Sequence, residues 1–129
     1  MFNFKNLKLM YGYEFLKKFL HEEGFRMNDE DSIISFKYQG NNYLVFKSES
    51  PYLQIVMICN TKNIDTHKLL DVCNSMNSDK FVVKFTVDNS GNVWCSYEFK
   101  PTEETSSDDF DTILVLLDKA SDELFEKLR

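Results

Sequence analysis

The stretch KFVVKFTVDNSGNVWCSYEF, from Lys80 to Phe99, decides the fold because apolar and polar side chains alternate on both sides of a short polar turn. A period of two is typical of a β-strand that buries one face. The central DNSG supplies residues that tolerate the left-handed backbone of a tight turn. The stretch therefore predicts a hairpin in which Trp94 points away from the face that carries Val93 and Cys95.

The residues before this hairpin predict three more strands. SIISFKY and YLVFK alternate around the turn residues QGNN, which is the pattern of a second hairpin. YLQIVMIC, residues 52–59, is apolar at nearly every position, as expected of a strand that is covered on both sides. We expect this strand to lie at the centre of the sheet.

Three segments have helical spacing of apolar residues. YEFLKKFLHEEGF carries Gly24 next to its end, a residue suited to the left-handed position after a helix. This helix should start between about residues 4 and 12. NIDTHKLLDVCNSMN offers Asn63 as an N-cap, and SSDDFDTILVLLDKASDELFEKLR offers Ser106 or Ser107. We predict a single α+β domain over residues 1–129, in the order α-β-β-β-α-β-β-α, with helices packed on one face of a five-stranded antiparallel sheet.

Composition and charge restrict the cellular compartments and the classes of partner that we expect for this protein. The chain of 129 residues has a net charge of −6 and scattered basic residues, which argues against a nucleic-acid partner. Its N-terminus MFNFKNLKLM lacks the apolar core of a signal peptide, and no later run reaches membrane length. Three cysteines without a CxxC pair are typical of free thiols in a reducing compartment. We expect a cytoplasmic protein that does not bind membranes.

Two stretches, FLHEEGF and NSMNSDKFVVKFTVDNSGNVWCSYEF, resemble the YbjN-domain family of bacterial proteins over roughly residues 11 to 128. The matching positions are Asn74, Asn77, Asp88 and Gly91. The chain departs from the family in having no aromatic residue between the two asparagines. The resemblance implies a fold similar to that of type III secretion chaperones, often dimeric, and a role as a regulator or chaperone-like module without an established catalytic site.

The residues themselves predict no catalytic, metal or cofactor site. Cys73 is the candidate nucleophile, and its only nearby base is His67, six residues earlier. On a helix this spacing separates the two side chains by roughly 120° around the axis, so they cannot form a dyad locally. Cys73 shares a stripe with Leu69 and Met76 instead, which indicates a core position. HEEG, residues 21–24, points its possible metal ligands in different directions.

The alternation leaves a second, partly apolar sheet face, and such faces often mark interaction surfaces. We predict an interaction surface made of Trp94, Val82, Tyr52, Val56 and Ile58, unless the second helix or the N-terminal segment covers it. The leading hypothesis is a non-enzymatic protein-interaction module, chaperone-like or regulatory, which binds a protein partner or a second copy as a homodimer. The alternative is a small-molecule-binding domain or weak enzyme whose pocket assembles from distant residues.

Overall fold

The computed structural model describes residues 13–129 except 15, 31–32, 48–51, 80–81 and 103. The start expected for the first helix lies outside these residues, and its described part spans 16–22, with 13–14 also helical. The other elements follow in the order β1 (Met27–Glu30), β2 (Ile33–Tyr38), β3 (Asn41–Lys47), β4 (Leu53–Cys59), α2 (Thr66–Asp79), β5 (Lys84–Val87), β6 (Val93–Phe99) and α3 (Ser107–Leu128).

The strands form one antiparallel sheet in the order β1-β2-β3-β4-β6-β5. The predicted α+β class, the order of the three helices and five strands that were predicted, and the central position of β4 are confirmed. The described sheet has six strands rather than five, because β1 (MNDE) pairs with β2 along one edge. This strand has no alternating apolar pattern, and backbone pairing at an edge needs none, so it could not be predicted from its residues.

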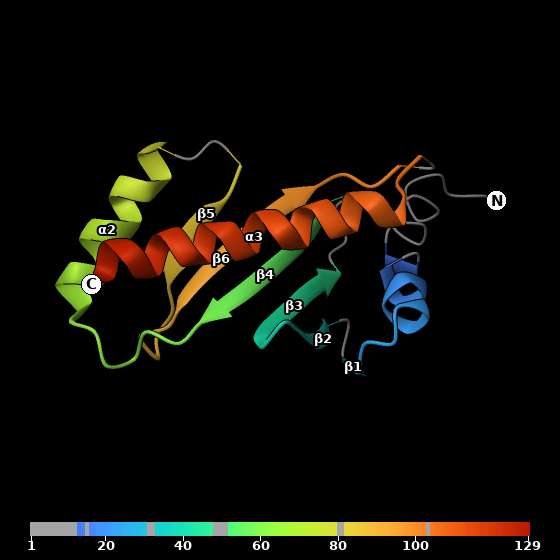
Figure 1. The fold of residues 1–129 in the computed structure, drawn as a ribbon, viewed down its shortest axis with the longest axis horizontal. Helices are drawn as coiled ribbons and strands as arrows, with labels where there is room; N and C mark the ends of the chain where they lie inside the picture. Colours follow the sequence, from blue (N-terminus) through green and yellow to red (C-terminus); the bar gives the residue numbers. More distant parts are fainter. Residues whose placement is uncertain (1–12, 15, 31–32, 48–51, 80–81, 103) are drawn as a thin grey trace.

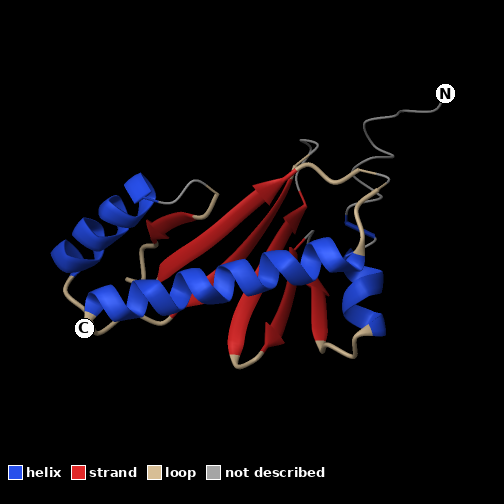
Figure 2. Cartoon of the chain, turned by 45° about the horizontal axis from the view of Figure 1, so that its top comes forward, coloured by secondary structure: helices blue, strands red, loops and turns tan. Residues whose placement is uncertain are grey.

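The helices lie against one face of the sheet. Figures 1 and 2 show α3 running along this face, with α2 beyond β5 and the N-terminal helix at the opposite end. Phe110 of α3 is fully buried, and its ring centroid lies 5.8 Å from that of Phe19 in the N-terminal helix and 5.7 Å from that of Phe99 in β6. One hydrophobic core therefore joins two of the helices to the sheet.

The turns and caps agree largely with their sequence signals. Gly24 has φ +78°, and the Phe25 amide donates to the Leu20 carbonyl at 2.9 Å, as in a Schellman ending. Ser106 is the N-cap of α3, as predicted. The N-cap predicted for α2 at Asn63 is wrong. The helix begins at Thr66, and the Asp65 carboxylate accepts from the Lys68 amide at 3.2 Å, so Asp65 takes this role.

The outer edge of β5 is occupied by a side chain of α2. The Asn77 side-chain amide donates to the Phe85 carbonyl at 2.8 Å and accepts from the Phe85 amide at 2.7 Å. An asparagine amide thus supplies the donor and acceptor that a further strand would supply. Because β5 ends the sheet, this contact closes the edge to strand pairing at Phe85.

Tyr43 is buried between the sheet and α3, and its hydroxyl has no hydrogen-bond partner. An unpaired buried hydroxyl destabilises the fold, so Tyr43→Phe should raise the free energy of unfolding by about 1 kcal/mol. Burial, aided by the negative charge of Asp118, also raises the pKa of Tyr43 above its ordinary value. Urea unfolding at neutral pH checks the first effect.

The raised pKa adds an alkaline test of the same variant. Because the pKa of Tyr43 is higher in the folded than in the unfolded state, its neutral hydroxyl contributes stability below about pH 10. This contribution is lost as the pH rises further. Tyr43→Phe should therefore lose less stability than the wild type between pH 9 and roughly pH 11. Tyr97→Phe, at a half-buried position on the same face, is the matched control. If stability depends on alkaline pH in the same way in both variants, the pKa of Tyr43 is not raised by its burial.

Candidate interaction surface

The strand register sorts side chains between the two sheet faces. Val93, Cys95, Tyr97 and Phe99 face the helices, whereas Trp94, Ser96 and Glu98 alternate onto the other face, here called the far face. Trp94 is paired with Ile58 of β4 across this face. The predicted orientation of Trp94 is therefore confirmed, and Ile58 is its neighbour.

An aromatic pair crosses the middle of the far face. The ring of Trp94 stacks with that of Phe46 at a centroid distance of 6.0 Å and an interplanar angle of 19°. In the register, Phe46 lies opposite Gln54 and Trp94 opposite Ile58, so Val56 of β4 lies between them. Val56 has no exposed surface although it does not belong to the main core. In this register the two rings flank Val56 on the far face.

Val56 therefore cannot contact a partner directly, which corrects one member of the predicted surface. Phe46, which is not among the predicted surface residues, takes its place. The alternation in YLVFK puts Phe46 on a face with Leu44, but only the strand register reveals that this is the face of Trp94.

The Trp94 ring is held by the turn that precedes it. Its indole Nε1 donates to Asp88 Oδ2 at 2.8 Å, while Asp88 Oδ1 accepts from the Ser90 and Asn92 amides at 2.8 and 2.9 Å. The Asn92 amide makes the largest contribution to lowering the pKa of Asp88 below its ordinary value, and the Trp94 indole and the Ser90 amide add to it. One carboxylate thus fixes both the turn and the indole.

The other two predicted surface residues lie away from Trp94. Tyr52 precedes β4 and is 49% exposed, and Val82 precedes β5 and is 55% exposed. Both lie toward the opposite end of the strands from the Trp94 and Ile58 pair. The structure brings Trp94, Ile58 and Val56 together, with Tyr52 and Val82 at a distance. The N-terminal segment that we considered as a cover for this face is outside the described residues.

The cysteines occupy core positions. Cys73 is buried on the side of α2 that faces the core, and burial raises the pKa of its thiol, which opposes activation as a nucleophile. His67 is exposed. Cys59 and Cys95 are free thiols whose Sγ atoms lie 3.7 Å apart, and hydrogen bonding to Cys59 raises the pKa of Cys95.

The described part of the chain contains neither a candidate metal site nor a candidate membrane-spanning helix. Its His, Cys, Asp and Glu side chains form no group of three that could hold a metal ion. None of its helices combines the length and apolar character needed to cross a lipid bilayer.

The fold defines the class of protein that this chain resembles. No protein-family model and no curated protein matches its sequence. Its structure is similar to a chain in the HopA1–SchA chaperone–effector complex, with a TM-score of 0.67 and 13% identity over 93% of this chain and 97% of that one. The chain therefore shares its α+β fold with a chain of a chaperone–effector complex.

Two further structures share this fold. YbjN from E. coli, a proposed transcription regulator, has a TM-score of 0.63 and 9% identity over 86% of both chains. An uncharacterized protein from Methanothermobacter thermautotrophicus has a TM-score of 0.63 and 14% identity over 89% of this chain and 94% of that one. The YbjN-like fold implied by the sequence resemblance is confirmed.

Proposed function

We propose that this protein is a non-enzymatic interaction module, chaperone-like or regulatory, that binds a protein partner through the far face of its sheet. The observation that carries the proposal is the aromatic pair of Phe46 and Trp94, which lies opposite the face that packs against α3. Aromatic side chains that are partly exposed and rigidly held are favoured at protein interfaces. The free cysteines fit a role in the cytoplasm.

The similarity to a chaperone–effector complex and to YbjN supports the same class of function. Fold alone does not establish function, so the proposal depends on the surface. The partner is a client protein or a second copy of this chain. In either case Trp94 should contribute a central contact.

Trp94→Ala should abolish specific binding, because loss of a central interface tryptophan typically weakens affinity by about 30-fold or more. The measurement compares partners cross-linked to the wild type and to the variant in the native cytoplasm, together with sedimentation of each purified protein. Trp94→Phe keeps an aromatic ring and should retain part of the binding.

Val115→Ala is the matched control, since Val115 is an exposed apolar residue of α3. It should leave both readouts unchanged. The proposal fails if the wild type is strictly monomeric at high concentration and Trp94→Ala captures the same proteins in the same amounts.

A further inference from the structure

The far face carries an open hollow of about 600 Å³ whose lining comes from β1, β2, β3 and the end of β4, together with Arg26 just before β1. Ile58, which pairs with Trp94 in the sheet, lines the hollow together with Leu44. The polar lining includes Arg26, Lys37, Asn28 and Asn42. The hollow therefore joins an apolar floor to a polar rim and is continuous with the candidate interaction surface.

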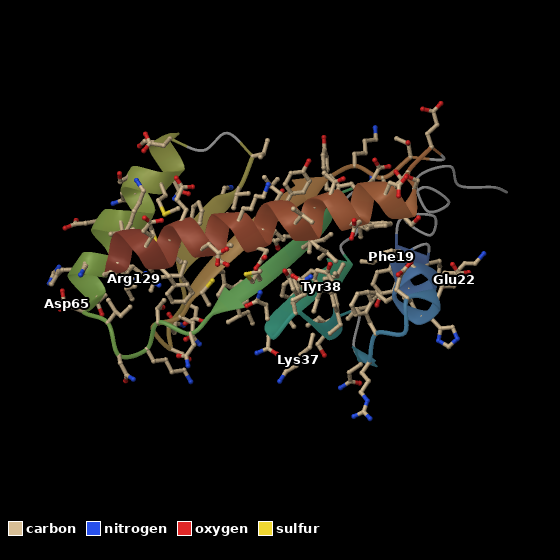
Figure 3. The ribbon with its side chains drawn as sticks, in the orientation of Figure 1. Phe19, Glu22, Lys37, Tyr38, Asp65 and Arg129 are labelled. Atoms are coloured by element: carbon tan, nitrogen blue, oxygen red, sulfur yellow. The ribbon has the colours of Figure 1, made fainter. Side chains whose placement is uncertain are left out.

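The charge of the rim is opposite to that of the whole chain. Arg26 and Lys37 are exposed, and neither forms a salt bridge with another described residue. None of the described residues that line the hollow is acidic, although the chain carries a net charge of −6. Figure 3 shows Lys37 farther from α3 than its neighbour Tyr38. Two cations that form no salt bridge within the described part of the chain thus flank an apolar floor.

We propose that this hollow binds an acidic and apolar peptide segment of a partner protein. A partner carboxylate pairs with Arg26 and Lys37, and an adjacent apolar side chain packs on Ile58 beside Trp94. Small-molecule pockets are mostly enclosed and lined by apolar and aromatic side chains, whereas this hollow is open and five of its nine lining residues are polar or charged. An extended segment with alternating side chains fits this mixture better. The inference rests on the proposed function of the far face.

The test is an anisotropy titration with a short labelled peptide in which Glu alternates with Leu. A second peptide carries Lys in place of each Glu. At low salt the wild type should bind the acidic peptide roughly ten-fold more tightly, and added salt should reduce this preference. The double charge reversal R26E with K37E should abolish or invert it. Equal binding of the two peptides to the wild type, or none, would overturn the proposal.

The double reversal K68E with K119E is the matched control. It makes the same change in net charge at exposed positions of α2 and α3. Binding should be retained there, and an equal loss in both double variants would refute the site. If native partners are lost from Trp94→Ala but kept by R26E with K37E, the interaction surface stands and the acidic segment fails. If the wild type is a dimer that R26E with K37E separates, the occupant is a second copy and the proposal of a partner segment is wrong.

Discussion

Replacing Asn77 by alanine is expected to lower the free energy of unfolding by about 2 kcal/mol. The substitution removes both hydrogen bonds to the backbone of Phe85, at 2.7 and 2.8 Å. It also opens the edge of β5 to pairing with other chains, so the variant should aggregate more readily. Urea unfolding measures the first effect, and hydrogen exchange of the Phe85 amide shows directly whether that group has lost its protection.

Asn74→Ala is the matched control, because Asn74 lies one turn earlier on the same helix and is exposed. It should leave stability nearly unchanged. Asn77→Asp retains an acceptor for the Phe85 amide and loses the donor to its carbonyl, so its stability should fall between those of the wild type and Asn77→Ala. Equal stability of Asn74→Ala and Asn77→Ala would show that the edge contact contributes nothing.

Most of the fold could be predicted from the sequence because its signals are local. The alternation from residue 80 to residue 99 indicates a hairpin, and the Gly24 and Ser106 signals place helix ends within a residue or so. The short edge strand β1 carries no such local pattern. Its pairing with β2 depends on tertiary position, which no property of MNDE reports.

The candidate surface could be predicted only in part. Alternation alone places Trp94 and Ile58 on the far face, and the structure pairs them. The stacking of Phe46 on Trp94 depends on the register across three strands, which no local pattern specifies. For the same reason, the sequence could not show that Val56 is buried although it lies on the far face.

Two of the positions that match the YbjN-domain family, Asn77 and Asp88, have structural roles. Asn77 lies in the last turn of α2 and closes a sheet edge, while Asp88 belongs to the predicted turn and also holds Trp94. Asn77 contacts the Phe85 backbone of β5, and Asp88 contacts the Trp94 indole of β6, so each bonds to a different secondary-structure element from its own. They link the α2 helix and the second turn to the hairpin that carries the candidate surface.

Asp88→Asn is expected to release Trp94 and to lower the free energy of unfolding by about 2 kcal/mol. Asp88 accepts three hydrogen bonds, two on Oδ1 and one on Oδ2. An asparagine amide has only one oxygen, so it must place an N–H group against the indole or against the two turn amides. Because Trp94 is the only tryptophan, its fluorescence reports the change directly. Asp122→Asn, at an exposed position of α3, controls for loss of charge.

The acid dependence of stability gives the sharper test of this carboxylate. A folded pKa below the unfolded value of about 3.9 means that the Asp88 contribution is complete above that pH and is lost as pH falls through the folded pKa. Asp88→Asn should lack this part of the acid destabilisation, whereas Asp122→Asn should retain it. Combining Asp88→Asn with Trp94→Phe isolates the contribution of the indole hydrogen bond to the free energy of unfolding. Asp88→Asn should lower this free energy by less once the indole is gone. A full cost in both backgrounds would mean that Asp88 stabilises only its turn and does not hold Trp94.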